Sequence, residues 1–275
     1  MGVLNATPDS FSDGGRFLEE RDALARVDDL MTQGADLIDI GGESTRPGSA
    51  PVPAHEQLRR TLGPLRHAVA QGALVSIDTT DPQVAAAALD QGACIVNDVS
   101  CLRDGDGLAR VAAAAGASLI IMHAREPMSR MPGFSVCADD AYGDVVADVA
   151  REWLAAGNKA LRAGLDRSDV LLDPGLGFNK NAAHSNALVA RLHELVALGF
   201  DVVVGPSRKS FLAADVKTDP MHRLGGTVAA SLACAARGAR ILRVHDVLDV
   251  RQALSVARAV RFVPQDTPTR EGAHV

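Results

Sequence analysis

Residues Leu74–Asn97 read LVSIDTTDPQVAAAALDQGACIVN, and this stretch shows the unit from which the rest of the chain is built. Its first run, LVSI, is almost continuously apolar, which is typical of a strand in a parallel sheet buried on both faces. Asp81 and Pro82 then supply an N-cap and a first-turn proline for an alanine-rich helix. A second apolar run, CIV, follows Gly92. The stretch therefore predicts two parallel strands joined by a helix.

The same unit recurs along the 275-residue chain. Segments with helical spacing, such as the stripe Leu188, Leu192, Leu195 and Val196, alternate with eight apolar runs. This alternation predicts an α/β fold, a single (β/α)8 TIM barrel, whose typical length is about 250 residues. An open doubly wound sheet follows the same local rules, so periodicity alone leaves it as an alternative. The predicted strands are Gly2–Asn5, Ala35–Ile40, Leu74–Asp78, Cys94–Asn97, Ser118–His123, Val170–Asp173, Val202–Gly205 and Arg240–Val244.

Composition excludes several classes of function. The chain is 47% hydrophobic, which provides a large core and argues against a disordered protein. A formal net charge of −6 and an aromatic content of 3% make duplex and single-stranded nucleic acid unexpected partners. The four cysteines form no zinc-type pattern. The sequence shows neither a signal peptide nor an apolar run of about 20 residues, so we predict a cytoplasmic protein outside the membrane.

We predict one barrel domain over residues 1–262 and a disordered tail over residues 263–275, because the tail has no apolar period. Two long polar segments, residues 6–15 and 41–48, follow the first two predicted strands and are rich in Gly, Ser and Asp. We predict that they form long βα loops at the C-terminal face of the barrel, where they act as lids over bound ligands.

Polar side chains end nearly every predicted strand. Such a group at the end of a buried strand costs free energy unless it meets a partner or a ligand. In a parallel barrel all these ends lie on one face, where active sites are built. The residues are Asn5, Asp78, Asn97, Asp98, His123, Asp173, Ser207, Arg208, Lys209, Arg243, His245 and Asp246.

Structural interpretations of these residues remain open beside the functional one. They are helix N-caps for Asp98 and Asp246, a hydrogen-bonded core position for His123, and ion pairs of Asp78 and Asp173 with Lys209 or Arg243. Motifs of other enzyme classes are missing: residues 175–180 read GLGFNK and lack the third glycine of a dinucleotide-binding loop.

Eight segments, in the same order along the chain, closely resemble dihydropteroate synthase, a folate-pathway enzyme family inhibited by sulfonamides. Each segment alone is a weak signal, but the ordered set, which extends from residue 1 to about residue 260, is specific. The segments are MGVLNATPDSFSDGG (Met1–Gly15), DIGGESTRPG (Asp39–Gly48), SIDT (Ser76–Thr79), NDVS (Asn97–Ser100), MH (Met122–His123), DPGLGFNK (Asp173–Lys180), GPSRKSFL (Gly205–Leu212) and RVHDV (Arg243–Val247).

The resemblance implies a barrel enzyme that joins 6-hydroxymethyl-7,8-dihydropterin pyrophosphate to p-aminobenzoate and releases 7,8-dihydropteroate and pyrophosphate. It also implies Mg²⁺ as cofactor, sensitivity to sulfonamides and a homodimer formed through helices distant from the barrel mouth. The partners it implies are the two small-molecule substrates.

The resemblance also assigns roles to individual residues. Asp78, Lys209, Asp9 and Arg46 are the implied catalytic residues, and Asn5 is the implied metal ligand. The implied substrate-binding residues are Asp78, Asn97, Asp173 and Lys209 for the pterin, Arg243 and His245 for the pyrophosphate, and Thr45, Phe178 and Ser210, with Arg46, for p-aminobenzoate. Met122 and Gly205 are also implied to bind substrate.

The chemistry suits these residue types. Departure of pyrophosphate leaves a cation at the pterin methylene, which the Asp78 carboxylate can stabilise electrostatically. Arg243, His245 and magnesium are the expected counter-charges of the departing anion. We expect the p-aminobenzoate carboxylate near Ser210, where the residues after Lys209 open a helix whose free N–H groups attract anions.

Two other functions stay open from the sequence. One is a non-catalytic pterin-binding module, which the full set of substrate-binding residues disfavours. The other is a pterin-dependent methyltransferase that serves a corrinoid protein, which the Ser207–Lys209 run and the Arg243–His245 segment disfavour.

Overall fold

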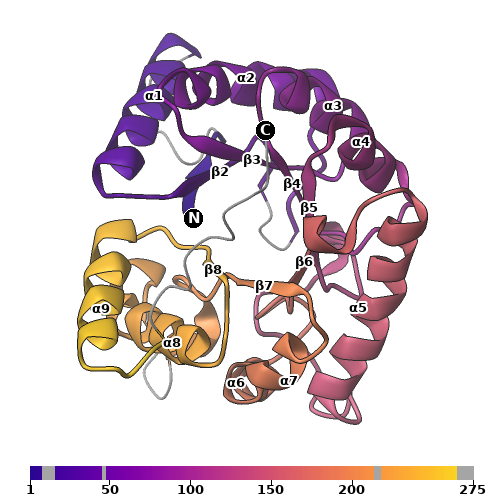
Figure 1. Ribbon diagram of the computed structural model, residues 1–275, viewed down its shortest axis with the longest axis vertical. Coiled ribbons are helices and arrows are strands. Elements are labelled where there is room, and N and C mark those ends of the chain that lie inside the picture. Colours follow the sequence, from indigo (N-terminus) through magenta and orange to yellow (C-terminus); the bar gives the residue numbers. More distant parts are fainter. Residues whose placement is uncertain (8–15, 45–47, 214–217, 265–275) are drawn as a thin grey trace.

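The computed structural model describes residues 1–7, 16–44, 48–213 and 218–264. Its centre is an eight-stranded parallel sheet in which the strands follow one another in chain order (Figure 1). This order lacks the reversal that defines a doubly wound sheet, so that alternative is wrong. The strands are β1 (Gly2–Asn5), β2 (Leu37–Gly41), β3 (Leu74–Asp78), β4 (Ile95–Asp98), β5 (Ser118–Met122), β6 (Val170–Asp173), β7 (Asp201–Val204) and β8 (Ile241–Leu242).

The two edges of the sheet meet. Gly2 forms a parallel bridge with Val244, two residues beyond the end of β8. The N–H of Val3 donates to the carbonyl oxygen of Val244 at 3.2 Å, and the N–H of Val244 donates to that of Met1 at 2.9 Å. The sheet is therefore curled, and its first strand is joined to the segment after its last one.

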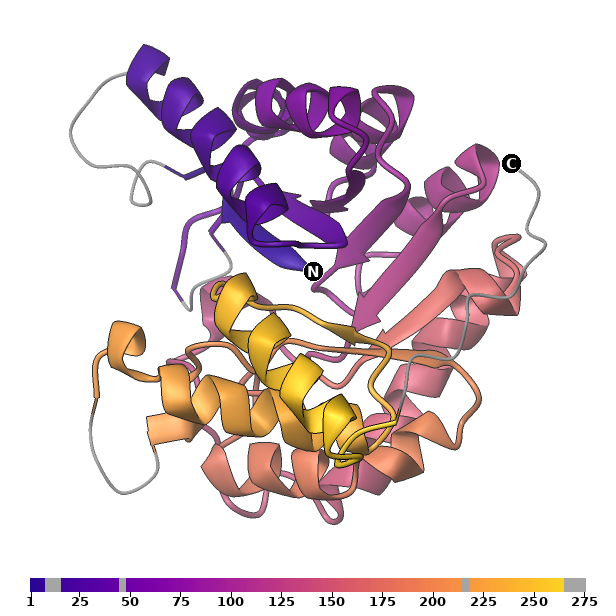
Figure 2. The ribbon, with the colours of Figure 1, turned by 60° about the vertical axis from the view of Figure 1, so that its left-hand side comes forward.

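Helices cover the outer face of the curled sheet (Figures 1 and 2). They are α1 (Arg16–Thr32), α2 (Ala54–Ala70), α3 (Pro82–Asp90), α4 (Gly107–Ala115), α5 (Val145–Arg162), α6 (Ala182–Ala190), α7 (Leu192–Val196), α8 (Leu224–Ala236) and α9 (Val247–Ala259). The predicted start of α3 is confirmed, because the Asp81 carboxylate accepts the N–H of Gln83 at 2.7 Å. Among the described residues, no helix is both long and apolar enough to cross a membrane.

Several predicted boundaries are wrong in detail. β2 begins at Leu37 rather than Ala35, and β8 has only two residues because the chain beyond it bridges to β1 instead. The predicted helical stripe from Leu188 to Val196 is divided between two helices, α6 and α7, which are separated at Arg191. Its three leucines are nevertheless fully buried, as a stripe facing the core requires.

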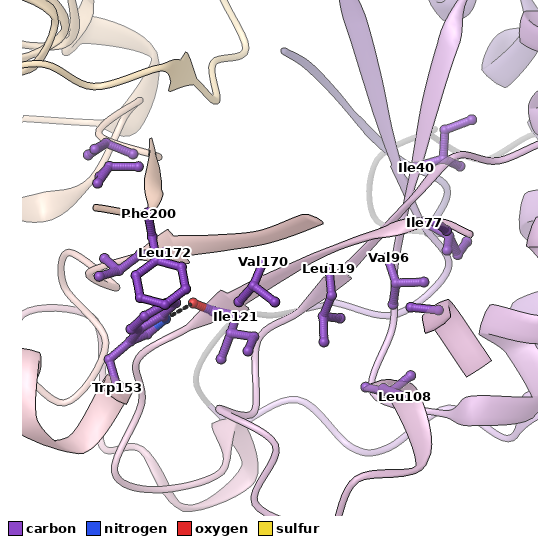
Figure 3. Packing of buried hydrophobic residues seen from close by; sticks show 14 of the residues in the cluster. Ile40, Ile77, Val96, Leu108, Leu119, Ile121, Trp153, Val170, Leu172 and Phe200 are labelled. Carbon is purple, nitrogen blue, oxygen red and sulfur yellow. Dashed lines mark hydrogen bonds between the residues drawn. The ribbon is translucent and has the colours of Figure 1, made fainter. Parts of the chain in front are cut away.

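Alternate strand residues face two different cores. The larger core lies between sheet and helices, where the Trp153 ring of α5 contacts Phe200 and its Nε1–H donates to the carbonyl oxygen of Ile121 at 2.8 Å (Figure 3). A second apolar cluster comes from Met1, just before β1, and from strand residues of the opposite parity, which face the inside of the curl: Leu37, Ile95, Ile120, Leu171 and Val203. This cluster closes the interior below the carboxyl ends of the strands.

The long-loop prediction falls mostly outside the described residues, which exclude 8–15 and 45–47. The division into a 1–262 domain and a tail stays a prediction; Val263 is buried, and its N–H donates to Ala257, while residues 265–275 are outside the described part.

Candidate active site

Polar residues from several strands converge above the inner apolar cluster, at the carboxyl ends of the strands. At their centre, the Arg243 guanidinium contacts two buried carboxylates. Asp39 Oδ2 lies 2.6 Å from both Nε and Nη2 of Arg243, and Asp78 Oδ2 lies 2.9 Å from Nη2. Asn97 Nδ2 donates to the same oxygen of Asp39 at 3.2 Å. Residues from β2, β3, β4 and the segment after β8 thus share one polar cluster.

Burial sets the electrostatics of this cluster. It raises the pKa of Asp78, and the neighbouring Asp39 carboxylate raises it further, whereas Arg243 lowers it. Burial lowers the pKa of Arg243, but Asp39 and Asp78 raise it more, so the guanidinium stays charged. The structural interpretation of Asp78 as an ion-pair partner of Arg243 is confirmed. Both groups also lie in the opening at the carboxyl ends of the strands, which we call the mouth of the sheet.

Asp173 and Lys209 form a second charged group. Asp173 ends β6, and its Oδ1 accepts the N–H of Gly175 at 2.7 Å. Burial raises the pKa of Asp173, and Lys209 lowers it. Burial also lowers the pKa of Lys209 to about 8, against the attraction of Asp173. The Lys209 Nζ donates to the carbonyl oxygen of Leu176 at 2.6 Å and lies 4.5 Å from the centre of the Phe178 ring.

The Phe178 side of the mouth is apolar. Phe178 packs edge-to-face on Phe134 with ring centres 5.2 Å apart, and it clusters with buried Met122. Ser210 Oγ donates to Phe134 O at 3.1 Å and lies 2.8 Å from Ser135 Oγ. In place of the expected α-helix directly after Lys209, Ser210–Ala213 forms a short 3-10 helix, and among the described residues that follow it the next α-helix begins at Leu224.

His245 has a different charge from the expected one. Its Nδ1 lies 3.0 Å from Ser207 Oγ, and that oxygen also accepts the His245 N–H at 3.2 Å. Burial and the nearby Arg243 and Arg208 guanidinium groups lower the pKa of His245 to about 3. The ring is therefore neutral near pH 7, and it can offer a hydrogen bond but no positive charge.

The other predicted site residues have simpler positions. Asn5 is half-buried at the end of β1, and Gly205 follows β7, close to Arg243. Asp9, Thr45 and Arg46 lie outside the described residues. Within the described ranges, no group of three or more His, Cys, Asp or Glu side chains could hold a metal ion.

Two predicted N-caps have other roles. Asp98 accepts the N–H groups of Ser100 at 2.8 Å and Leu102 at 2.6 Å, so it caps a turn rather than a helix. Asp246 precedes α9 without a side-chain cap and instead forms an ion pair with Arg208 at 2.5 Å.

A cavity of about 650 Å³ adjoins the cluster at Asp78. It extends over the loops after β3 and β4, and its lining includes Glu43, Thr79, Ser100 and Arg103. Burial raises the pKa of Glu43, whose carboxylate accepts the Gln57 Nε2–H at 3.1 Å. A small molecule in the mouth thus has space beside Asp78.

A buried lysine in contact with the backbone of Phe178 was not predicted. Lys180 is fully buried, and its Nζ donates to the carbonyl oxygens of His123, Gly175 and Phe178 at 3.0 to 3.2 Å. It also lies 2.9 Å from His123 Nδ1, while His123 Nε2 lies 2.9 Å from Glu152 Oε2. His123 is therefore a satisfied core residue, as its structural interpretation had it. The sequence offered one signal for Lys180, its place in the DPGLGFNK segment.

Fold and site together define a small-molecule enzyme: acidic, amide and cationic side chains meet at the carboxyl ends of a curled parallel sheet, beside a cavity. The family described as pterin binding enzyme matches residues 1–245, and the chain belongs to this family.

Curated relatives extend the match along the chain. It is 39% identical over 263 residues to dihydropteroate synthase of Escherichia coli (strain K12), covering 94% of this chain and 90% of that one. The Mycobacterium leprae enzyme of the same name is 42% identical over 265 residues, covering 94% and 92%. A third relative is the probable bifunctional folylpolyglutamate synthase/dihydropteroate synthase of Haloferax volcanii, which is 43% identical over 95% of this chain. That protein is much longer, and the chain spans only 30% of its length.

Solved structures agree in fold. Xanthomonas albilineans dihydropteroate synthase with 4-aminobenzoic acid superposes with a TM-score of 0.86 at 42% identity, covering 96% of this chain and 93% of that chain. The same enzyme in complex with 7,8-dihydropteroate gives a TM-score of 0.83 at 39% identity, with the same coverage.

The buried state of His123 predicts a pH dependence of folding. Burial and Lys180 lower its pKa from 6.5 to about 4, so the unfolded chain binds a proton at pH 5 that the folded chain does not. Stability is therefore lost as pH falls through 6.5, and between pH 7 and pH 5 His123 should contribute a loss of about 2 kcal/mol. Urea denaturation at both pH values measures the free energy of unfolding. From pH 7 to pH 5 this free energy should fall less in His123→Gln than in the unmodified protein, by that amount.

The exposed His193 provides the matched control. In His193→Gln the free energy of unfolding should fall between pH 7 and pH 5 as much as it does in the unmodified protein. An equal drop in His123→Gln and the unmodified protein would show that His123 does not carry this dependence.

Proposed function

We propose that this chain condenses 6-hydroxymethyl-7,8-dihydropterin pyrophosphate with p-aminobenzoate to give 7,8-dihydropteroate and pyrophosphate. The chain is a transferase of folate biosynthesis, as its dihydropteroate synthase relatives are by name. The observation that carries this proposal is the cluster of Asp39, Asp78, Asp173, Arg243 and Lys209 at one end of the sheet.

The cluster suits a reaction through a pterin cation. The mouth brings three carboxyl groups together with the Arg243 and Lys209 side chains, and His245 adds no positive charge near pH 7. Asp78 and Asp173 can accept hydrogen bonds from a pterin edge, and Asn97 can both donate and accept. When the C–O bond to pyrophosphate breaks, the positive charge at the methylene develops beside carboxylates that are already in place. The amine of p-aminobenzoate then attacks this carbon and loses a proton.

The arylamine is assigned to the Phe178 side of the mouth. Phe178 and Phe134 provide an aromatic wall, and the Lys209 ammonium over the Phe178 ring can attract a carboxylate. Ser210 adds a hydroxyl there. Thr45 and Arg46 on this side, and Asp9 as a catalytic residue, stay predictions because they lie outside the described residues.

Magnesium fits this site as a partner of the pyrophosphate. An amide oxygen of Asn5 is a suitable hard ligand at the end of β1, and Mg²⁺ normally takes few protein ligands and fills its shell with phosphate oxygens and water. Bound there, the ion would neutralise charge on the departing pyrophosphate. Arg243 Nη1, which has no acceptor among the described residues, is free to donate to the same anion.

The first test is pyrophosphate release by the purified chain. We expect release only when the pterin substrate, p-aminobenzoate and Mg²⁺ are all present, with inhibition by a sulfonamide. A folded protein that binds the pterin but releases no pyrophosphate would instead support the binding module. Demethylation of methyltetrahydrofolate in the presence of a corrinoid acceptor would support the methyltransferase.

Asp78→Asn tests the proposed cation. The amide keeps the shape of the side chain and removes its charge, so kcat should fall by about 100-fold or more, the scale of losing one preorganised electrostatic contact. Steady-state pyrophosphate release measures kcat, and calorimetry measures pterin affinity. A kcat within a factor of two of the unmodified enzyme would contradict the role of Asp78.

We also propose a homodimer formed through helices away from the mouth. Large apolar side chains are exposed along and just after α9, which lies on the outside of the molecule (Figure 2): Leu248, Val256, Val260 and Phe262. Light scattering should give twice the 28.7 kDa mass of the chain, and Val256→Glu should shift it towards the monomer. A monomeric mass at micromolar concentration would contradict the dimer.

A further inference from the structure

We propose that Asp39 is a positioning residue, which holds Arg243 and Asn97 in the orientation that the pterin substrate meets. This inference rests on the proposed function and deepens it. Asp39 lies in the middle of β2, is fully buried, and faces the inside of the curled sheet. It was absent from the predicted site because it does not end its strand.

A single oxygen of Asp39 connects two substrate-binding residues. Its Oδ2 lies 2.6 Å from Nε and Nη2 of Arg243 and accepts the Asn97 Nδ2–H at 3.2 Å. Arg243 follows β8, which lies beyond β1, and Asn97 lies in β4, which lies beyond β3, so these two side chains reach Asp39 of β2 from opposite directions along the sheet. With Oδ2 as acceptor, the Asn97 amide group is turned so that its carbonyl oxygen is left for another donor.

The contact also selects which nitrogen of Arg243 faces a ligand. Nε and Nη2 are engaged by Asp39 and Asp78, whereas the described residues provide no hydrogen-bond acceptor for Nη1. Without Asp39, the guanidinium could rotate about its side chain and pair with Asp78 through both terminal nitrogens. That rearrangement would occupy the carboxylate which the proposed reaction needs for the pterin.

Asp39 is costly for the fold, which argues against a purely structural role. Its Oδ1 is buried and has no hydrogen-bond partner among the described residues, and its charge lies near that of Asp78. The inner cluster beside it is apolar and includes Leu37 of the same strand. An apolar residue would fill this position at a lower cost in desolvation. What the carboxylate provides is the orientation of Arg243 and Asn97.

A purely structural role and a positioning role differ in their effect on Asp78. The charged groups that act on Asp78 are Asp39 of β2, Glu43 after that strand, Asp98 of β4, and Arg243. Asp39 raises the pKa of Asp78, so removing its charge should lower that pKa. The acidic limb of the pH profile, where Asp78 gains a proton, should then move to lower pH. Loss of packing alone would leave this limb in place.

The test compares Asp39→Asn with Ser76→Ala. Ser76 is the register partner of Asp39 on β3, is equally buried, and its Oγ has no hydrogen-bond partner in the described part of the chain. In Asp39→Asn we expect kcat/KM for the pterin substrate to fall about 10- to 100-fold, as for one lost charge-assisted hydrogen bond. The KM for p-aminobenzoate should stay within about a factor of two, because its proposed wall lies on the Phe178 side. Ser76→Ala should match the unmodified enzyme.

Three results would overturn the inference. One is a folded Asp39→Asn with unchanged kcat/KM. Another is a loss of activity with the acidic limb unmoved. If Asp39→Asn does not fold, the contact is tested in the unmodified protein by the rate of hydrogen exchange of the Arg243 Nε–H. The NMR signal of this group is assigned by its disappearance in Arg243→Lys. Slow exchange supports the Asp39 contact, and exchange as fast as an exposed arginine contradicts it.

Failure of the proposed function is separable from failure of this inference. If the unmodified chain releases no pyrophosphate, the proposed reaction is wrong. Asp39 is then judged by calorimetry with the pterin pyrophosphate alone, where Asp39→Asn should weaken binding about 10-fold or more and Ser76→Ala should not.

Discussion

The guanidinium of Arg243 lies between the carboxylates of Asp39 and Asp78, and the mouth of the sheet is organised around this contact. Two buried carboxylates repel each other, and each would cost several kcal/mol to desolvate without a partner. Arg243 reaches both only because the segment after β8 lies next to β1. The hydrogen bonds between Val3, Val244 and Met1 make that closure. The ion pairs in the mouth therefore depend on the closure of the sheet.

The layering of the interior explains why these charges act strongly. The apolar cluster that includes Leu37, Ile120 and Val203 closes the space below the mouth, so water reaches the polar residues from one side only. In such a site the effective dielectric constant is low, and fixed charges act over longer distances than they do in water. The same burial that makes Asp78 difficult to ionise makes its charge effective beside a developing cation.

Sequence patterns predicted the fold well because they depend on local rules. Continuous apolar runs, the Asp81-Pro82 helix start and polar strand ends all follow from burial along one element. The polar residues at the ends of β3 and β6, Asp78 and Asp173, lie where these rules placed them. The short β8 and the break at Arg191 depend instead on how distant segments pack.

The site was predicted less completely for the same reason. Asp39 and Lys180 act through partners 204 and 57 residues away in the chain, Arg243 and His123. Apart from their places in the Asp39–Gly48 and Asp173–Lys180 segments of the resemblance, nothing in their own neighbourhood distinguishes them from an ordinary strand aspartate or loop lysine. The neutral state of His245 likewise arises from burial next to Arg243 and Arg208, which a sequence does not display.

The charge distribution also bears on how the anionic product would leave. A pyrophosphate group carries several negative charges, and the mouth it would leave already has more carboxylates than cations. Arg208 is engaged by Asp246, His245 is neutral, and Arg243 is shared by two carboxylates, which leaves Nη1 as its available donor. Side chains of the described residues thus supply too little positive charge to balance a pyrophosphate. A divalent cation held at Asn5, as proposed above, would supply the remainder by neutralising part of the charge on the departing group.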